Sequence, residues 1–253
     1  MKESEYLHMF EEEEHHWWYA GMRLIVRSLV PPASLGNNPR LLDAGCGTGY
    51  TMGWFRLHYG AMIMGFDYYP QGLAFCRRRG ERDLVQADAA RLPFAKDTFD
   101  MVTSFDVVSH LAPESSRALA LGEFLRVLKP GGRLLMRVPA YEWLKSSHDD
   151  DVMTYRRYGG RELRAALIHA GFRPLRMTFA NTVLFPAAMC WRLLKKAGLA
   201  PAGSDVRPGT RGASWMNSVL LAILKTEAAL LRGDRFTFPF GLSLFALASK
   251  PAE

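Results

Sequence analysis

The stretch LLDAGCGTGY, residues 41–50, constrains the fold more than any other part of the chain. An apolar run ends in Asp43, and glycines follow at positions 45, 47 and 49. Glycines at this spacing permit a tight turn and let a ligand approach bare backbone. A helix that begins near Tyr50 would direct the positive end of its dipole at that ligand. The stretch therefore predicts a strand, a ligand-binding turn and a helix, with a merely tight turn as the alternative.

Strand and helix patterns alternate from Arg40 onward, which is typical of βαβ units and a mostly parallel sheet. Right-handed crossovers then give a doubly wound, three-layer α/β domain. We expect seven strands, with helices before the sheet and a helical insertion before the last strand. The expected strands are 40–44, 61–66, 83–87, 99–105, 132–138, 172–180 and 241–250. The expected helices are 50–58, 70–79, 113–128, 160–170, 183–198 and 214–231.

The flanks of this pattern predict the domain organisation. Residues 4–29 are expected to be helical, with a break near Gly21. We predict four parts: an N-terminal helical lid at 1–39, an α/β core at 40–180, a helical insertion at 181–240 that would cover a bound substrate, and a final core strand at 241–253.

The glycine spacing excludes two common nucleotide-binding loops. A dinucleotide fingerprint needs G-x-G-x-x-G, but Tyr50 and Met52 stand where its third glycine would be. The G-x-x-x-x-G-K-[ST] pattern of a P-loop is also missing from the sequence. The turn therefore fits neither of these loops, and Asp43 at the end of the strand disfavours a merely tight turn.

Acidic residues recur at the ends of the next two expected strands. Asp67 closes MIMGFD, where a carboxylate can accept hydrogen bonds from both hydroxyls of a ribose. Asp88 follows LVQA at the same level of the sheet, where it can accept from an adenine amino group. A helix cap is the alternative role for Asp67. Three acids at successive strand ends indicate a nucleoside site more strongly than any one of them.

Composition limits the remaining classes of function. The 253 residues carry a formal charge of +7, but the basic residues are scattered and acids cluster at 11–14, so nucleic acid is disfavoured as a partner. Three cysteines at unmatched spacings predict no disulfide framework and no cysteine-based metal site, and they favour a reduced, cytoplasmic setting. Neither a secretory signal nor an apolar stretch long enough to span a bilayer is expected.

Four ordered segments, LLDAGCGTGY, GFDYYP, QADAARLPFAKDTFDMVTSFDVVSHL and LKPGGRLLMRVPA, resemble the class I S-adenosylmethionine-dependent methyltransferases over about 40–140. The flanks HHWWYAGMRLIVRSLV and HDDDVMTYRRYGGRELRAALIHAGF resemble a bacterial, small-molecule subgroup of that family. Members of the subgroup often carry a second histidine where this chain has Thr154.

The resemblance implies a seventh strand that runs antiparallel, a role that residues 241–249 could fill. It also implies S-adenosylmethionine as cofactor and assigns roles to its binding residues. The glycine turn would line the methionine end, Asp67 would hold the ribose, Tyr68 would pack on the adenine, and Asp88 with Ala89 would contact the adenine edge. Trp17, Trp18 and Tyr19 are candidates to cover the site, with Arg23 meeting the methionine carboxylate. The predicted cofactor-binding residues are Tyr19, Arg23, Asp43, Gly45, Cys46, Gly47, Gly49, Asp67, Tyr68, Asp88, Ala89 and Phe105.

Candidate catalytic residues are histidines near the expected mouth of the site. Methyl transfer needs a base only if the acceptor must lose a proton, and His110 or His148 could supply one near neutral pH. Structural roles for both remain open. The acids at 149–151 beside His148 are read as a solvated turn, so no metal site is predicted. The predicted substrate-binding residues are Trp18, Asp106, Arg156, Arg157 and Tyr158. Arg156 and Arg157 could bind an anionic acceptor, with structural salt links as the alternative.

We therefore predict an S-adenosylmethionine-dependent methyltransferase that acts on an oxygen or nitrogen of a small natural-product, sugar or quinone-like acceptor. The apolar stretch 181–199 ends in basic residues and could cover an apolar acceptor, contact a membrane surface peripherally, or form a homodimer. A lipid-linked acceptor and a non-catalytic cofactor-binding protein are the alternative functions.

Overall fold

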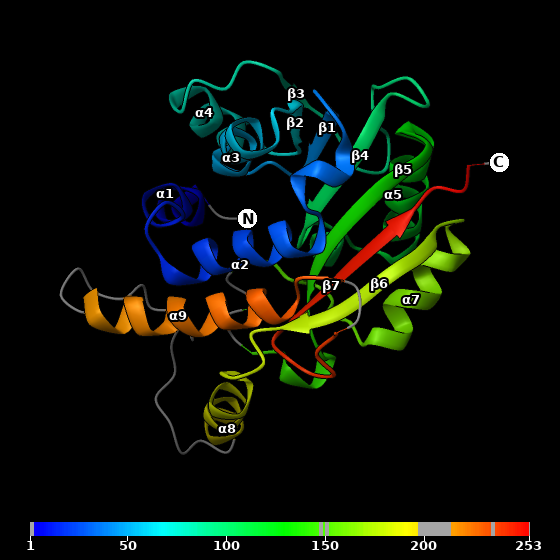
Figure 1. The fold of residues 1–253 in the computed structure, drawn as a ribbon. Coiled ribbons are helices and arrows are strands. Elements are labelled where there is room, and N and C mark those ends of the chain that lie inside the picture. The colour runs from blue at the N-terminus through cyan, green and yellow to red at the C-terminus, as the bar shows by residue number, and fades with distance from the viewer. Residues whose placement is uncertain (1–2, 147–148, 150–151, 197–213, 234–235, 253) are drawn as a thin grey trace.

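The structure is a computed structural model that describes residues 3–146, 149, 152–196, 214–233 and 236–252. Its centre is one seven-stranded sheet in the order β3-β2-β1-β4-β5-β7-β6, in which β7 alone runs antiparallel to its neighbours (Figure 1). The predicted doubly wound sheet with one antiparallel strand is confirmed. The strands are β1 Arg40–Ala44, β2 Met62–Asp67, β3 Leu84–Gln86, β4 Phe99–Phe105, β5 Leu128–Pro139, β6 Arg173–Ala180 and β7 Ser243–Ser249.

Helices cover both faces of the sheet and give the three layers. Successive strand residues point to opposite faces, so Leu41 and Leu42 of β1 belong to two different core clusters. Helices α5 and α7 contribute to one cluster, and α2, α3, α4 and α9 contribute to the other. The helices are α1 Glu3–Glu12, α2 Trp17–Leu29, α3 Tyr50–Tyr59, α4 Pro70–Arg78, α5 Glu114–Val127, α7 Gly160–His169, α8 Phe185–Lys196 and α9 Ser214–Leu230. Short 3₁₀ turns are η1 Pro32–Leu35, η2 Val107–His110 and η3 Glu142–Leu144.

The break in the N-terminal helical segment lies elsewhere than we predicted. Helix α1 ends at Glu12 and α2 begins at Trp17. The side chain of His16 caps the start of α2. Gly21 instead lies inside α2, where a Cβ would collide with the side chain of Leu224 on α9. This glycine permits close helix–helix approach, so its presence did not indicate a break.

Helices α8 and α9 follow β6 and precede β7, as an insertion at one end of the sheet (Figure 1). Helix α9 is fastened to α2 because Asn217 Oδ1 accepts from Trp17 N at 2.8 Å. Glu227, buried on α9, accepts from the main-chain N–H groups of Asn181, Thr182 and Val183 and so fixes the chain that leads into α8. In the described part of the chain, no helix is both long and apolar enough to cross a bilayer.

Candidate active site

A cavity of about 1080 Å³ opens at the carboxyl ends of β1, β2 and β4. Ligands of doubly wound sheets bind at this end because the strand order reverses between β1 and β4 there. Helices α1 and α2, the turn η2, residues 152–155 and helix α8 complete the wall. The fold therefore brings the N-terminal helices α1 and α2 and the later helix α8 to the same cavity as the glycine turn.

The glycine turn is built from left-handed backbone. Gly45 has φ 69° and Gly49 has φ 84°, conformations that favour glycine. A Cβ on Gly45 would also collide with Val107 of η2, so the turn and η2 lie in contact. Gly49 is the residue that precedes α3, and it faces Cys76 of α4 instead of the cavity lining. The turn thus presents main chain to the cavity at Gly45 and Gly47.

Asp43 is a buried carboxyl at the end of β1. Thr103 of β4 donates its hydroxyl to Asp43 Oδ1 at 2.7 Å. Burial, assisted by the nearby carboxylates of Glu13 and Asp67, raises the pKa of Asp43 to about 7 despite the lowering effect of the Thr103 hydrogen bond. The cavity therefore contains an acidic group that would be stabilised in its charged form by a cationic ligand.

Asp67 is held at the end of β2 by three donors. Its Oδ2 accepts from Gly47 N at 3.0 Å, and its Oδ1 accepts from Tyr69 N at 2.9 Å and from the Tyr6 hydroxyl at 3.1 Å. Burial nevertheless raises its pKa. Two carboxylate oxygens offer about four lone-pair directions, so Asp67 keeps capacity to accept from a ligand hydroxyl.

Helix α1 is anchored on the glycine turn through a second carboxylate, Glu13. Glu13 follows α1, accepts from the hydroxyl of Thr48 and pairs with Arg79 at 3.0 Å. Arg23 of α2 donates to the main-chain oxygen of Glu13 at 2.9 Å. Burial raises the pKa of Glu13, although Thr48 and both arginines oppose that rise. These contacts hold α1 across the opening above the turn.

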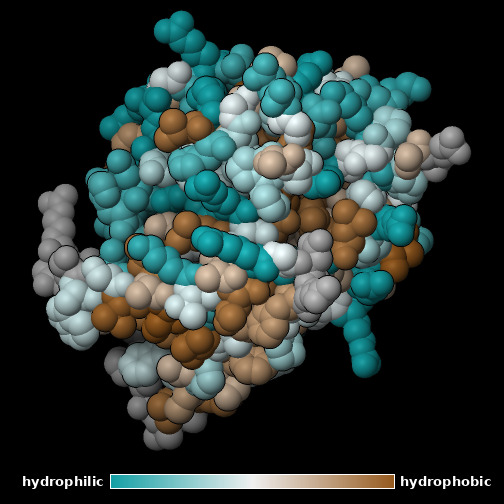
Figure 2. Space-filling view, in the orientation of Figure 1, coloured by the Kyte–Doolittle hydropathy of each residue, from teal (hydrophilic) through white to brown (hydrophobic). Residues whose placement is uncertain are grey.

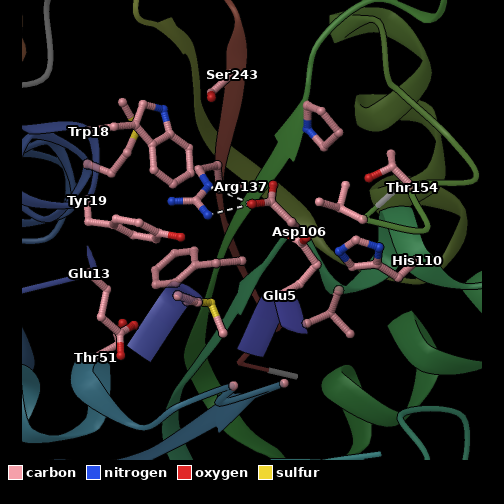
Figure 3. Close-up of a pocket in the computed structure, with 18 of the residues that line it drawn as sticks. Glu5, Glu13, Trp18, Tyr19, Thr51, Asp106, His110, Arg137, Thr154 and Ser243 are labelled. Carbon is pink, nitrogen blue, oxygen red and sulfur yellow. Dashed lines mark hydrogen bonds and ion pairs between the residues drawn. The ribbon is translucent and has the colours of Figure 1, made fainter. Parts of the chain in front are cut away.

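An ion pair between Asp106 and Arg137 crosses the centre of the cavity (Figure 3). Asp106 follows β4 in a left-handed conformation, with φ 65°, and Arg137 projects from β5. The Arg137 guanidinium lies 4.5 Å from the ring centre of Trp18 and 5.4 Å from that of Phe105. The pair fixes both groups between two aromatic rings.

His110 ends η2 on the opposite side of this pair from Trp18 and Tyr19 (Figure 3). Its ring Nδ1 lies 3.0 Å from the main-chain oxygen of Met153. A carbonyl oxygen can only accept, so this contact requires the proton to be on Nδ1. In the neutral ring Nε2 is then left with a lone pair, which is the arrangement of a general base.

The segment after η3 is fixed against η2 by main-chain and ionic contacts. Ser109 O accepts from Tyr155 N at 2.9 Å and from Arg156 N at 3.2 Å. Arg157 and Asp149 form a buried, two-pronged ion pair of 2.8 and 3.0 Å, and Arg157 also donates to Ala140 O. Arg157 is therefore neutralised and holds the loop that carries Met153.

The structure brings most of the predicted site residues to this cavity. Its lining includes Trp18, Tyr19, Arg23, Asp43, Gly45, Cys46, Gly47, Asp67, Tyr68, Asp88, Ala89, Phe105, Asp106, His110 and Arg157. Three predicted residues lie elsewhere: Gly49 packs on α4, Arg156 pairs with Glu162 at the surface, and Tyr158 lies in the core. His148 lies outside the described residues.

Sequence reasoning missed Tyr6, Glu13 and Arg137. A signal for Arg137 was present, because it is a charge inside the apolar strand sequence RLLMRVP. Tyr6 and Glu13 gave no comparable signal, since their roles depend on how α1 folds back over the turn.

The seven-stranded sheet with β7 antiparallel is that of the Rossmann-like methyltransferase fold. Residues 42–136 match a family described as a methyltransferase domain. The chain therefore contains a methyltransferase domain whose cofactor is S-adenosylmethionine.

Two curated relatives differ in the acceptor that their names give. A tRNA (carboxymethyluridine(34)-5-O)-methyltransferase of Arabidopsis thaliana is 35% identical over 121 residues, which is 48% of this chain and 28% of that protein. A phthiotriol/phenolphthiotriol dimycocerosates methyltransferase of Mycobacterium leprae is 36% identical over 99 residues, 38% of this chain and 36% of that protein. The chain thus spans only about a third of the length of these relatives.

A solved structure extends the likeness of fold to nearly the whole chain. A complex of the Haloferax volcanii Trm112 methyltransferase activator with a methyltransferase gives a TM-score of 0.61 at 22% identity, covering 98% of this chain and 94% of the matched chain. At this identity the likeness concerns the fold.

Proposed function

We propose that this chain transfers the methyl group of S-adenosylmethionine to an oxygen or nitrogen of a small acceptor with an apolar body, bound in the cavity between η2 and α8. The cofactor supplies a methyl group on a positively charged sulfur, and the protein positions the acceptor and excludes water.

The residues around the glycine turn fit this cofactor. Gly45 and Gly47 present main chain to the cavity where its methionine part would lie, and Asp67 retains acceptor capacity for ribose hydroxyls. The raised pKa of Asp43 fits a cationic ligand, whose charge would stabilise the ionised carboxyl. We assign these residues to cofactor binding.

The observation that carries the catalytic proposal is the contact between His110 and Met153. It fixes the ring tautomer so that Nε2 can accept a proton from a hydroxyl or amine. His110 lines the same cavity as the glycine turn, and the paired Asp106 and Arg137 lie between His110 and Trp18 (Figure 3). We assign His110 as general base, and Asp106 as a residue that orients the acceptor.

The cavity wall favours an uncharged acceptor with an apolar body. Helix α8 contributes an apolar face with Ala187, Ala188 and Trp191, and Leu184 just before the helix extends it. Within the described lining, each arginine already holds an oxygen partner: Arg23 with Glu13 O, Arg137 with Asp106, Arg157 with Asp149, and Arg192 with Leu144 O. A polyanion would have to displace these partners.

Transfer RNA is the second candidate acceptor, favoured by the name of the Arabidopsis relative. A lipid-linked acceptor is a variant of the first proposal, because it would offer the apolar body that α8 can contact. A non-catalytic cofactor-binding protein would share the cavity but would leave the His110 geometry without a role.

Methyl-labelled S-adenosylmethionine distinguishes these candidates. The protein is incubated with the labelled cofactor and a bacterial extract, and the products are divided into an organic-soluble fraction and a precipitated RNA fraction. We expect label in the organic-soluble fraction that depends on His110. Label in RNA would replace the proposal with the second candidate, and cofactor binding without any transfer would favour the non-catalytic protein. Calorimetry with S-adenosylmethionine against NAD tests the cofactor separately.

A further inference from the structure

Helices α8 and α9 expose an unusual number of large apolar side chains. On α9, Trp215 is 72% exposed and Val219 is 50% exposed, and on α8 Leu193 is 49% exposed. Figure 2 shows apolar side chains gathered at the lower left, over α9 and α8. Exposed apolar surface that is contiguous in this way marks an interaction site.

This surface belongs to well-anchored helices. The opposite side of α9 is buried against α2 through Leu224, and Asn217 bonds to both Trp17 N and His15 O. Since these contacts fix the rotation of α9, the exposure of Trp215 and Val219 is a consequence of the fold.

The surface is continuous with the cavity. Trp191 of α8 lines the cavity and is 44% exposed, and Leu220 of α9 also lines it. The apolar wall of the cavity thus extends outward onto the two helices.

The charges of the two helices favour an anionic occupant. Helix α8 has the sequence FPAAMCWRLLKK, which contains no acid; it ends in Lys195 and Lys196, and its third basic residue, Arg192, is buried on Leu144 O. Helix α9 contains Lys225 and a single acid, Glu227, whose carboxylate is buried on main-chain N–H groups. The chain as a whole has a formal charge of +7. Exposed tryptophans beside basic residues are the composition of helices that lie in a membrane interface.

We infer that the exposed faces of α8 and α9 dock on an anionic lipid bilayer, with Trp191 and Trp215 at the level of the headgroups. The helices lie in the interface: α8 has 12 residues and α9 has 17 residues, and neither is long and apolar enough to span. The inference concerns binding to lipid and does not depend on the methyl transfer proposed above.

Co-sedimentation of the full chain with vesicles tests the docking surface. One set of vesicles is phosphatidylcholine alone, and the other contains equal parts of phosphatidylcholine and phosphatidylglycerol. We expect the chain to bind the anionic vesicles, and the double variant Leu193→Glu/Val219→Glu to bind them at least about tenfold more weakly. Neither side chain lines the cavity, so the variant leaves the proposed active site intact.

Leu57→Glu on α3 is the matched control, because Leu57 is 80% exposed and lies away from both helices. It introduces the same charge and should leave vesicle binding unchanged. If the double variant does not fold, as judged by thermal unfolding, each single variant carries the same test with a smaller loss.

Three results would overturn the inference. The double variant could bind vesicles as the unchanged chain does, or the chain could bind both kinds of vesicle equally. The chain could also bind neither kind and instead form a dimer, by light scattering, that Val219→Glu dissociates. That last result would assign the surface to a second copy of the chain.

Discussion

The ring Nδ1 atom of His110 lies 3.0 Å from the main-chain oxygen of Met153, a residue 43 positions further along the chain. Met153 adopts a left-handed conformation with φ 58°, which few non-glycine residues do. The loop thus holds a carbonyl group at the one ring nitrogen that must carry a proton if the other is to act as a base. This relationship gives the proposed function its most direct test.

Replacement of His110 by glutamine should lower the rate of methyl transfer while cofactor affinity stays nearly unchanged. Loss of a positioned general base costs about a hundredfold to ten-thousandfold in rate. His58→Gln is the matched control. The ring Nδ1 of His58 on α3 also lies 3.0 Å from a main-chain oxygen, that of Trp54, but His58 does not line this cavity. Equal rates for the His110 variant and the unchanged chain would remove His110 from catalysis.

Replacement of Asp67 by alanine should weaken S-adenosylmethionine binding by about 10- to 100-fold, because a charged hydrogen-bond acceptor is lost. Calorimetry measures the affinity. Thermal unfolding of the same variant reports the loss of the contacts to Tyr6, Gly47 and Tyr69. An unchanged affinity would reject the ribose assignment of Asp67.

The fold was predictable because its signals are local. The alternation of short apolar strands with helical stretches and the glycine turn placed β1 and β4 at their observed bounds, 40–44 and 99–105. The position of the break in the N-terminal helices was not predictable in this way. In the sequence Gly21 resembles a helix breaker. In the structure a glycine is needed there because the side chain of Leu224 on α9, about two hundred residues away, packs against it.

The cofactor side of the site was also predictable, and the acceptor side was not. Asp43 lies near the end of β1, Asp67 ends β2 and Asp88 lies just after β3, so their position is set by the sheet. Arg156 and Arg157 are equivalent in the sequence, yet one pairs with Glu162 at the surface and the other is buried with Asp149. Such differences depend on how the loop packs, which the local pattern does not encode.

The raised pKa of Asp43 predicts that cofactor affinity depends on pH. A cationic ligand favours the ionised carboxyl, so affinity should increase about tenfold between about pH 6 and about pH 8, as Asp43 loses its proton near pH 7. Glu13 and Asp67, whose pKa values are also raised by burial, act in the same direction. Calorimetry across this range measures the slope.

S-adenosylhomocysteine is the matched control ligand because it lacks the charged sulfur, so its affinity should change less with pH. Asp43→Asn should flatten the dependence for S-adenosylmethionine. A slope that persists in this variant would assign the titration to another group.

The same group predicts how stability of the ligand-free protein changes with pH. The folded pKa of Asp43 lies above its unfolded value of 3.8, so between about pH 4 and pH 7 the folded state holds a proton that the unfolded chain has lost. The contribution of Asp43 to the free energy of unfolding therefore falls as pH rises through this window. Denaturant unfolding of the unchanged chain and of Asp43→Asn measures this, and the free energy of unfolding should decline less with rising pH in the variant.

The buried pair of Arg157 and Asp149 predicts that two neighbouring arginines differ strongly in their effect on stability. Arg157→Met leaves Asp149 as an uncompensated buried charge and should lower the free energy of unfolding by about 3–5 kcal/mol. Arg156→Met removes only the surface pair with Glu162 and should cost about 1 kcal/mol or less. Denaturant unfolding compares the two.

Arg157 also holds the segment that carries Met153, the residue that positions His110. A milder change, Arg157→Lys, should therefore lower the rate of methyl transfer more than it lowers cofactor affinity. A loss of affinity alone would contradict this positioning role.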